Sequence, residues 1–317
     1  MADTKVNFQH LPVLFAETMQ ALVTNPDGIY VDGTLGGGGH AEGILQRTSP
    51  NGVLIGIDRD ADARLAAGQR LAKFGSRFVP YQANFADLGA VLANLQIPAV
   101  DGVLLDIGVS SYQLDTPERG FSYMQDGALD MRMDRSGGRT AADLLAELST
   151  EELADIIYKY GEERFSRRIA RRITEEREQR PITGTVQLAD LVASAIPAAA
   201  RRQEKQHPAK RTFQALRIAV NDELGVLERG LRAGFAALKP GGRLAVITFH
   251  SLEDRIVKEY FASLCRGCIC PPDFPVCVCG KTPQGRLLSR KPQTASPKEL
   301  EANPRARSAK LRVIEKL

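Results

Sequence analysis

Apolar runs alternate with helical patterns over the first third of the chain. Four short runs rich in aliphatic residues each precede a polar or Ala-rich stretch. Because helices cover both faces of a parallel sheet, its strands read as continuous apolar runs. The alternation therefore predicts a doubly wound α/β sheet with right-handed crossovers. The four predicted strands are Ile29 to Asp32, Gly52 to Asp58, Arg77 to Gln82 and Asp101 to Ile107.

This alternation stops after the fourth run. Gly108 to Arg139 is rich in Gly, Asp and Ser, and Thr140 to Arg217 carries apolar residues at helical spacing only. A turn at Leu238 to Arg243 then leads into a strongly apolar strand, Leu244 to Phe249. A last alternating stretch, Ala309 to Ile314, predicts an edge strand.

We therefore expect an α/β domain interrupted by an inserted all-helical domain. The expected boundaries place the discontinuous α/β domain at residues 1–135 and 213–317, and the helical domain at residues 136–212. A length of 317 residues fits this organisation, because it exceeds one average domain and falls short of three.

Composition narrows the class of protein. Hydrophobic residues make up 43% and charged residues 25%, which is ordinary globular usage and excludes a disordered chain. No stretch approaches the ~18 apolar residues that a membrane span needs. Met1 to His10 is polar and lacks the apolar core of a signal peptide. We expect a cytoplasmic protein without a membrane partner.

The net charge of +4 conceals an uneven distribution. Lys159 to Arg217 holds 14 Lys or Arg against 7 Asp or Glu, and Lys281 to Leu317 holds 10 against 3. Each segment thus carries +7, so the remainder carries −10. An acidic body with two basic segments favours a polyanionic partner, although solvated basic helices would give the same pattern.

A glycine-rich loop follows the first predicted strand. Val31 to His40 reads V-D-G-T-L-G-G-G-G-H, and Asp58 ends the second strand. Gly36-x-Gly38-x-x-Ala41 with Asp58 fits the dinucleotide fingerprint, so a nicotinamide-dependent oxidoreductase is one interpretation. Asp32, however, would oppose a pyrophosphate at the helix N-terminus. The cationic S-adenosylmethionine suits this acidic surrounding better, and Asp58 can accept hydrogen bonds from ribose hydroxyls of either ligand.

The fourth predicted strand ends in a further carboxylate. Ligands of open α/β sheets bind outside the carboxyl ends of the strands, so Asp106 is expected beside a cofactor held by Asp32 and Asp58. Capping of the following loop is the alternative role. His40 opens the next helix, where it could cap it or meet a ligand through its amide or its ring.

Longer motifs resemble one family. The runs V-D-G-T-L-G-G-G-G-H and L-L-D-I-G-V-S-S-Y-Q-L-D resemble those of the bacterial 16S rRNA N(4)-cytosine methyltransferases. The resemblance extends in family order from His10 to nearly the C-terminus. Further matching segments are Glu118 to Asp134, Tyr160 to Arg171, His207 to Ile218, Phe249 to Lys258 and Asn303 to Arg312.

This resemblance implies a class I S-adenosylmethionine-dependent fold with a Rossmann-like sheet. It also implies methylation of the exocyclic N(4) amine of one cytidine in the decoding region of 16S rRNA, with the small (30S) ribosomal subunit as partner. A homodimer and a monomer both remain open. The implied cofactor contacts are Gly38, Gly39, His40, Asp58, Phe85, Asp106 and Gln113. Phe85 would form a wall for adenine, or pack in the core.

A cytosine amine is a poor nucleophile, because its lone pair is delocalised into the ring. Catalysis needs the base held in line with the methyl group and an acceptor for a hydrogen bond from the amine. Many exocyclic-amine methyltransferases place an Asp/Asn-Pro-Pro-aromatic motif here, whereas this chain has Asp106-Ile107-Gly108-Val109. Asp106 is therefore the expected catalytic residue, in contact with the amine or with the cofactor only. The segment from Gly120 to Asp134 is expected to close over the base.

An rRNA base must leave its stack to reach such a pocket. Phe121 and Tyr123 could stack on it, or serve as hydrophobic filler. One predicted helix carries the best phosphate-contacting group. A non-catalytic RNA-binding assembly factor would share these features and stays open as an alternative. The arginines of this group are Arg164, Arg167, Arg168, Arg171 and Arg172.

All five cysteines lie between Cys265 and Cys279, as C-x2-C-x-C-x6-C-x-C. Such clustering in a cytoplasmic protein points to metal or redox chemistry before disulfides. Four thiolates could bind zinc, although C-x-C is tighter than the spacing of most structural zinc sites. A reduced or oxidation-prone loop is the alternative. His250 follows the strand Leu244 to Phe249 and could face the site or cap the next helix.

Overall fold

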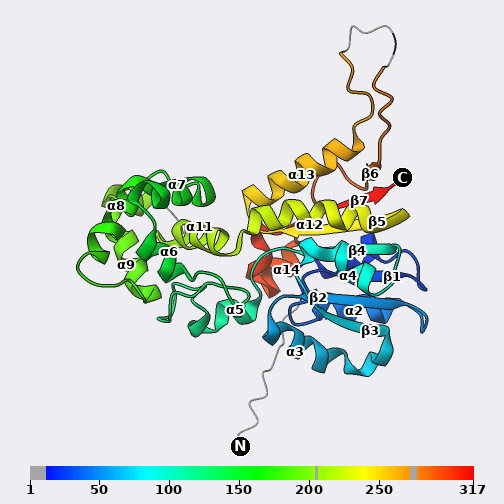
Figure 1. Cartoon of the computed structure of the whole chain (residues 1–317), viewed down its shortest axis with the longest axis horizontal. Helices are drawn as coiled ribbons and strands as arrows, with labels where there is room; N and C mark the ends of the chain where they lie inside the picture. Colours follow the sequence, from blue (N-terminus) through cyan, green and yellow to red (C-terminus); the bar gives the residue numbers. More distant parts are fainter. Residues whose placement is uncertain (1–11, 204–205, 272–275, 277) are drawn as a thin grey trace, which may run out of the picture. The chain divides into compact units, whose positions relative to one another are not determined.

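The computed structural model describes residues 12–203, 206–271, 276 and 278–317. The chain divides into two compact units, shown in Figure 1. Unit 1 comprises residues 1–108 and 224–317, and unit 2 comprises residues 109–223. Within the described residues, no helix combines the length and the apolar character that crossing a membrane requires.

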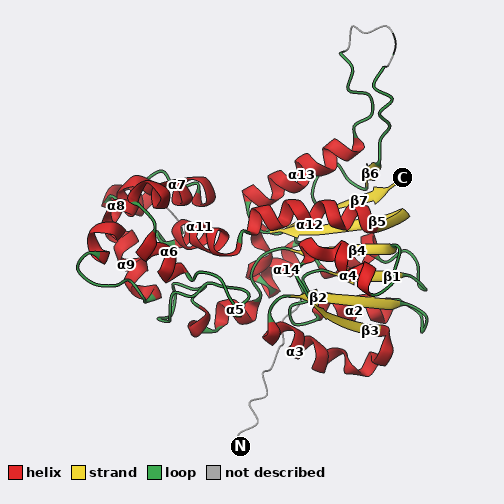
Figure 2. Ribbon diagram, viewed as in Figure 1, coloured by secondary structure: helices red, strands yellow, loops and turns green. Residues whose placement is uncertain are grey.

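Unit 1 is built on a seven-stranded sheet in the order β3-β2-β1-β4-β5-β7-β6. All neighbouring pairs are parallel except those of β7, which runs antiparallel to both β5 and β6 (Figure 2). The order reverses after β1, as it does in a doubly wound sheet. The strands are β1 (Ile29–Asp32), β2 (Val53–Asp58), β3 (Phe78–Gln82), β4 (Val100–Asp106), β5 (Leu238–Thr248), β6 (Gly285–Leu287) and β7 (Lys310–Lys316).

Helices cover both faces of this sheet, and alternate strand residues enter two separate cores. Tyr30 and Leu104 pack with α1, α2 and α3, whereas Val31 and Val103 pack with α4, α12 and α13. The predicted doubly wound α/β sheet is therefore confirmed. The helices of unit 1 are α1 (Phe15–Leu22), α2 (Gly39–Arg47), α3 (Ala61–Leu71), α4 (Leu88–Asn94), α12 (Glu223–Ala237), α13 (Ser251–Cys265) and α14 (Pro297–Ala302), with 3-10 turns η1 (Ala72–Arg77), η2 (Phe85–Asp87) and η4 (Pro304–Ser308).

Unit 2 is helical in its described residues and has one core of its own. Capping boxes begin three of its helices: Ser110 caps α5, Thr140 caps α6 and Ser149 caps α7. Its helices are α5 (Ser111–Asp115), α6 (Ala141–Glu147), α7 (Thr150–Gly161), α8 (Ser166–Arg177), α9 (Thr185–Ala195), α10 (Ala198–Gln203) and α11 (Lys210–Asn221), with the 3-10 turn η3 (Pro117–Arg119).

The predicted domain boundaries differ from those of the two units. Unit 2 takes in residues 109–135 and 213–223, which the sequence assigned to the α/β domain. The reason is packing: Phe121, Leu129 and Met131 belong to the helical core, as does Phe213 of α11. Segment 109–135 is rich in Gly and Asp, so its sequence did not indicate that some of its apolar side chains belong to the helical core.

Two further expectations need correction. The alternating stretch near Ala309 predicts an edge strand, but β7 lies between β5 and β6, and β6 forms the edge. Because β6 spans only three residues, it left no recognisable pattern in the sequence. The predicted turn at Leu238 to Arg243 falls within β5, where Gly241 has a φ of +78°.

Candidate active site

Three aspartates end neighbouring strands of unit 1. Asp32 ends β1, Asp58 ends β2 and Asp106 ends β4, at the edge where an open α/β sheet binds ligands. Thr34 connects two of them: its backbone N–H donates to Asp32 Oδ1 at 3.1 Å, and its Oγ1 accepts from the Asp106 N–H at 2.6 Å. Sequence reasoning missed Thr34, because a threonine in a glycine-rich turn carries no distinctive signal.

His40 completes this group from the first turn of α2. Its Nδ1 lies 3.5 Å from Asp106 Oδ2, and its Nε2 lies 3.1 Å from the carbonyl oxygen of Val13. Burial alone would lower the pKa of His40. The hydrogen bond to Asp106, with the charges of Asp106 and Asp32, outweighs burial and raises the pKa of the imidazole above 6.5. The ring is therefore bound internally, to a carboxylate and a carbonyl group.

Asp32 is the most deeply buried of the three carboxylates, with 1% of its surface exposed. Burial raises its pKa from 3.8 to about 6, and the charges of Asp106 and Asp58 contribute in the same direction. The charge of His40 and the Thr34 N–H oppose this rise without cancelling it. A carboxylate held in this way gains from a cationic ligand, since a nearby positive charge favours ionisation.

Asp58 anchors the glycine loop. Its Oδ2 accepts from the Gly36 N–H and its Oδ1 from the Asp60 N–H, both at 2.9 Å. Burial raises the pKa of the carboxyl group above its usual range, against the opposing effect of these two hydrogen bonds. Each oxygen has two lone pairs, so acceptor capacity remains for ligand hydroxyls.

Different physical constraints require glycine at different positions of the loop. A Cβ on Gly39 would lie 2.5 Å from Pro12 Cγ, and a Cβ on Gly38 would lie 3.2 Å from Ala67 Cβ. Gly38 also has a φ of +75° as the N-cap of α2. Close packing thus explains why both positions require glycine, and cofactor contact by either residue stays a prediction. Gly36 instead has a φ of +49° with no atom closer than 3.8 Å to its added Cβ, so space remains open there.

Phe85 and Gln113 each have a structural role. The Phe85 ring packs on α12, where a Cβ on Gly230 would meet it at 2.3 Å, and the partly buried residue lies against the core beneath that helix. Gln113 lies in unit 2, and its Oε1 accepts from the Ser110 N–H at 3.0 Å in the capping box of α5. Cofactor contact by either residue stays a prediction.

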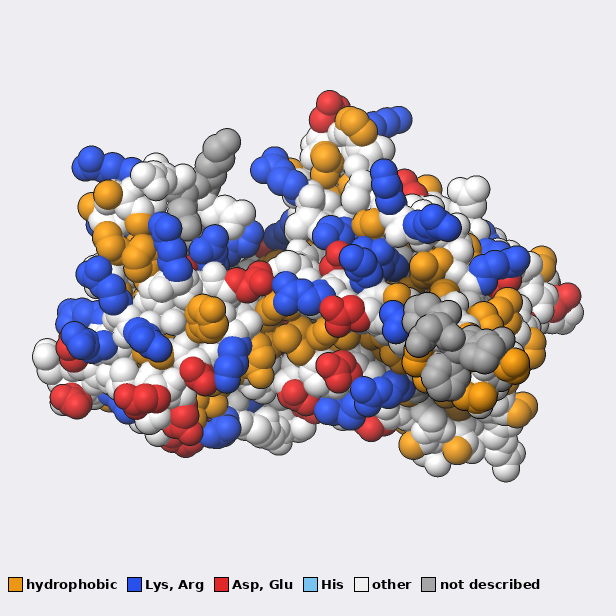
Figure 3. Space-filling model, turned by 90° about the horizontal axis from the view of Figure 1, so that it is seen from above, with side chains coloured by type: hydrophobic (Ala, Val, Ile, Leu, Met, Phe, Trp, Pro, Cys, Tyr) orange, Lys and Arg blue, Asp and Glu red, His pale blue; other side chains and the backbone are white. Residues whose placement is uncertain are grey.

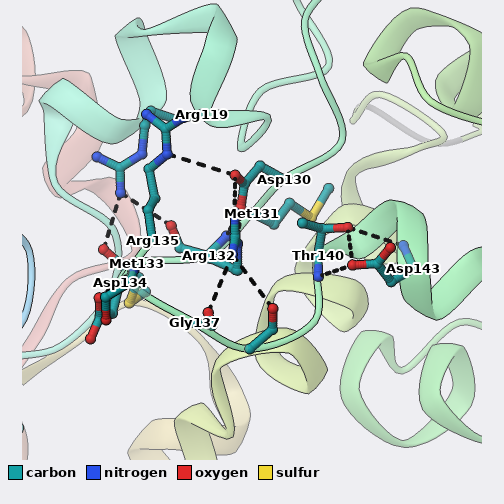
Figure 4. A network of polar contacts seen from close by, with 12 residues as sticks. Arg119, Asp130, Met131, Arg132, Met133, Asp134, Arg135, Gly137, Thr140 and Asp143 are labelled. Carbon is teal, nitrogen blue, oxygen red and sulfur yellow. Dashed lines mark hydrogen bonds and ion pairs between the residues drawn. The ribbon is translucent and has the colours of Figure 1, made fainter.

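The segment expected to close over the base is tied into unit 2 by a polar network (Figure 4). The buried Arg119 donates from Nη2 to the carbonyl oxygens of Arg132 and Met133, both at 3.1 Å. Arg132 binds Asp130 through Nε at 2.7 Å and through Nη2 at 2.9 Å. Burial would raise the pKa of Asp130, but the hydrogen bonds and charge of Arg132 lower it below its usual range.

The two aromatic side chains expected to stack on the substrate base differ in exposure. Phe121 is 6% exposed and belongs to the core of unit 2, which assigns its ring to packing. Tyr123 is only partly buried and stacks on His207, with ring centroids 4.5 Å apart. Its edge also contacts Phe213. Tyr123 also packs against this core, but it is less buried than Phe121; stacking of either ring on a base stays a prediction.

The predicted arginine group lies on and just before α8. This helix buries Ile169, Ala170 and Ile173, so the intervening arginines face outwards. Lys and Arg side chains, drawn blue, gather at several places over the helical unit (Figure 3). Arg172 is the most covered member and pairs with Glu176 at 3.5 Å. The exposed members are Arg164, Arg167, Arg168 and Arg171.

The structure bears on two further alternatives, which concern the role of His250 and the role of the cysteines. His250 caps α13: its Nδ1 accepts from the Glu253 N–H at 3.5 Å, and Glu253 Oε2 accepts from the His250 N–H at 3.2 Å. Among the cysteines, Cys277 lies outside the described residues. The sulfur atoms of Cys268, Cys270 and Cys279 converge in the connection between α13 and β6.

Comparison with known proteins decides the family. The model of the MraW methylase family matches residues 7–317. The chain belongs to this family. Three relatives, each called Ribosomal RNA small subunit methyltransferase H, match it over 98% of its length. They are 59% identical in Trichlorobacter lovleyi, 58% in Symbiobacterium thermophilum and 56% in Geobacter sulfurreducens, with 99%, 97% and 100% of the relative covered.

This membership confirms that the chain is a methyltransferase and that it uses S-adenosylmethionine, as the resemblance implied. It also favours a methylase over a nicotinamide-dependent oxidoreductase and over a non-catalytic assembly factor. The strand order, with its one reversed strand, agrees with the class I fold that the resemblance implies.

The residues at the sheet edge fit this cofactor. Asp106 Oδ1 is buried, and within the described part of the chain it has no hydrogen-bond partner. A buried carboxylate oxygen without a donor is costly, and a ligand N–H would satisfy it. Asp32 suits the cationic groups of S-adenosylmethionine, and Asp58 retains acceptor capacity for its ribose. The space beside Gly36 allows close approach to the backbone.

Proposed function

We propose that this methyltransferase methylates small-subunit rRNA, and specifically the exocyclic N(4) amine of one cytidine in the decoding region of 16S rRNA. The relatives' name supports the rRNA substrate. The structural observation that carries the proposal concerns Asp106 at the carboxyl end of β4. Among the described residues, none donates a hydrogen bond to its buried Oδ1, and the side chain lies close to His40 and acts electrostatically on Asp32.

When bound, S-adenosylmethionine supplies an electrophilic methyl group on a positively charged sulfur. The protein must then hold the amine in line with that group and help localise on the nitrogen the lone pair that is delocalised into the ring. Asp106 Oδ1 is the proposed acceptor for one N–H of the amine. That hydrogen bond pulls the nitrogen towards tetrahedral geometry and stabilises the positive charge that develops on it. No strong base is needed, because the methylated nitrogen releases its proton readily.

His40 is the proposed positioning residue for Asp106. Its Nδ1 lies 3.5 Å from Asp106 Oδ2, which holds that oxygen and leaves Oδ1 for the ligand. Ile107 and Gly108 replace the two prolines that many exocyclic-amine methyltransferases place after this position. Gly108 has a φ of +123°, and an added Cβ would lie 3.4 Å from the Phe249 ring. Phe249 thus supplies an aromatic side chain from another strand end.

The rRNA itself would be held mainly through its phosphates. Exposed arginines of α8 suit this role, since phosphate contacts supply most of the affinity of such interfaces. Tyr123 is the proposed stacking side chain for the displaced base. The 30S subunit is the proposed form of the substrate, which would place the protein in the cytoplasm. A homodimer is not required by any of these roles.

The deciding experiment is methyl transfer to 30S subunits from a strain that lacks this activity. Incubation with methyl-labelled S-adenosylmethionine, followed by nuclease digestion and mass spectrometry, should yield N(4)-methylcytidine in one decoding-region fragment. Label in a different nucleoside, or in the large subunit only, would refute the proposal.

A matched pair of variants tests the role of Asp106. Asp106→Asn keeps the size of the side chain but replaces one acceptor oxygen with a donor, so turnover should fall at least ~100-fold. Asp155→Asn, which changes an exposed aspartate on α7, should leave turnover unchanged. Wild-type turnover of a folded Asp106→Asn protein would remove Asp106 from the mechanism.

A further inference from the structure

Three cysteine sulfurs converge in the connection between α13 and β6. The two arms of this connection run side by side in Figure 1. The Sγ atoms of Cys268, Cys270 and Cys279 all lie within 4.8 Å of one another. The Sγ atoms of Cys268 and Cys279 are 3.7 Å apart, far beyond the ~2.05 Å of a disulfide bond.

This separation is the one that a tetrahedral zinc site imposes. With Zn–S bonds of about 2.3 Å and tetrahedral angles, two thiolate ligands of one ion lie about 3.8 Å apart. The C-x-C spacing is tight, yet the structure directs both Cys268 and Cys270 at Cys279 on the opposite arm. The distance between Cys268 Sγ and Cys279 Sγ therefore matches that of two zinc ligands, and Cys270 Sγ lies within 4.8 Å of both.

Backbone amides point at each of the three sulfurs. Ile269 N–H donates to Cys279 Sγ, Cys270 N–H to Cys268 Sγ and Val278 N–H to Cys270 Sγ, all at 3.4 Å. A thiol sulfur is a weak acceptor, whereas a thiolate gains from donors of this kind. Hydrogen bonds to sulfur commonly support thiolates that are bound to metals. Two of the three bonds also join one arm to the other.

Little hydrophobic packing holds the described part of this connection together. Ile269, Val276 and Val278 are 59%, 70% and 74% exposed. Ordering a segment without a core costs conformational entropy, and small elements of this kind are usually stabilised by a metal or by disulfides. The sulfur cluster joins the two arms, and the distance between Cys268 Sγ and Cys279 Sγ excludes a disulfide between them as the structure stands.

We propose that Cys268, Cys270 and Cys279 bind one Zn²⁺ ion, which fixes the connection between α13 and β6. A fourth ligand completes the coordination. The site is separate from the methyl-transfer chemistry, so its failure would leave the proposed function untouched. Thiolates in tetrahedral arrangement select zinc over the hard cations Mg²⁺ and Ca²⁺.

Cys265 provides the matched control. It lies at the end of α13, packs against the core of unit 1 and is not among the three converging sulfurs. Burial raises the pKa of its thiol, which disfavours the thiolate that zinc needs. A variant at this position changes the cysteine count without touching the cluster.

The test measures zinc in tag-free, full-length protein purified with a phosphine reductant and without chelators. Mass spectrometry of the elements should find about one zinc ion per chain in the wild type and in Cys265→Ser. Cys268→Ser, Cys270→Ser and Cys279→Ser should each lower the content at least tenfold. After zinc removal, Co²⁺ alone should produce the intense visible bands of tetrahedral thiolate coordination in the wild type and in Cys265→Ser only.

Two results would overturn the proposal. One is a wild-type protein that holds less than about 0.1 zinc ion per chain and takes up neither Zn²⁺ nor Co²⁺ under reducing conditions. The other is equal loss of zinc in Cys265→Ser and in the cluster variants. Circular dichroism of each variant verifies folding, so that loss of zinc is not mistaken for loss of structure.

Discussion

His40 Nδ1 and Asp106 Oδ2 lie 3.5 Å apart, although the two residues are 66 positions apart in the sequence. His40 is buried at the start of α2, and Asp106 ends β4. The contact couples the protonation of a histidine to the carboxylate proposed to hold the reacting amine. It also gives the ring a specific orientation, because Nε2 is bound to the Val13 carbonyl group.

Asp106→Asn should lower the pKa of His40. The substitution removes the carboxylate that raises this pKa and leaves burial, which lowers it. Nuclear magnetic resonance titration of the four histidines of the chain measures the change, with His40→Gln to assign the signal. An unchanged pKa in the variant would show that the contact is absent in solution.

Asp32→Asn should stabilise the ligand-free protein at high pH. The pKa of Asp32 is about 6 in the folded chain against 3.8 as the ordinary value, so the folded state binds more protons between these values. Stability from this group is complete below pH ~4 and is lost as the pH rises through about 6. From pH 5 to pH 8, the free energy of unfolding of the variant should rise by about 1 kcal/mol relative to wild type.

Urea denaturation at the two pH values measures this difference, and other titrating groups cancel in the comparison. Asp155→Asn serves as the control, since that side chain is exposed and its substitution should show no pH-dependent gain. A difference of the opposite sign would contradict the assignment of a raised pKa to Asp32.

The affinity for S-adenosylmethionine should fall as the pH drops below about 6. The proposed contact of this cationic ligand with Asp32 requires the ionised carboxylate, so Asp32 must lose its proton before or during binding. Isothermal titration calorimetry should find binding about tenfold weaker at pH 5 than at pH 7 in the wild type. Asp32→Asn should bind weakly with a flat profile; a wild-type profile in this variant would assign the pH dependence elsewhere.

Arg132→Ala should destabilise unit 2 by about 2–4 kcal/mol, because it leaves the buried Asp130 carboxylate without its bidentate partner. Arg139→Ala removes an exposed ion pair with Glu147 and should cost less than about 1 kcal/mol. Urea unfolding compares the two. Equal costs would mean that the network of Figure 4 contributes no more than a surface pair.

Replacing Arg167, Arg168 and Arg171 together by Gln should weaken rRNA binding and flatten its dependence on salt. Each lost phosphate contact should reduce the slope of log K against log salt by about 0.7–0.9. Filter binding over a salt series measures the slope. Stability should hardly change, since these side chains are exposed.

The matched control removes three paired cations from the same unit. Arg139, Lys159 and Arg180 already lie against Glu147, Asp155 and Glu176. Their replacement by Gln changes the net charge equally but should leave the slope within error of wild type. An equal effect in both triple variants would attribute the affinity to overall charge and not to α8.

The first strands of the sheet were predictable because buried strands appear in the sequence as continuous apolar runs. β1 falls on the predicted Ile29 to Asp32, and Val53–Asp58 lies within the predicted second run. The prediction that β7 forms an edge was wrong. Its alternating pattern is typical of an edge strand, but β6 pairs with its outer side, and a strand of three residues is too short to predict.

The site was predictable to the extent that it depends on strand ends. Asp32, Asp58 and Asp106 follow from the sheet, whereas the connection through Thr34 and the anchoring of His40 on Val13 need coordinates. From the sequence, Phe121 was open between stacking on the base and serving as hydrophobic filler. Its burial arises from long-range packing in unit 2, which local composition does not reveal.

The pairing of β4 with β5 has a kinetic consequence. These hydrogen-bonded neighbours are separated by the 131 residues between Asp106 and Leu238. Closing an unstructured loop of that length costs roughly 4 kcal/mol in chain entropy. Prior collapse of unit 2 shortens the loop, so the helical unit should act as a folding aid for the sheet. Refolding should then be slow, and mutations in the helical core should delay the appearance of methyl-donor binding more than they weaken it.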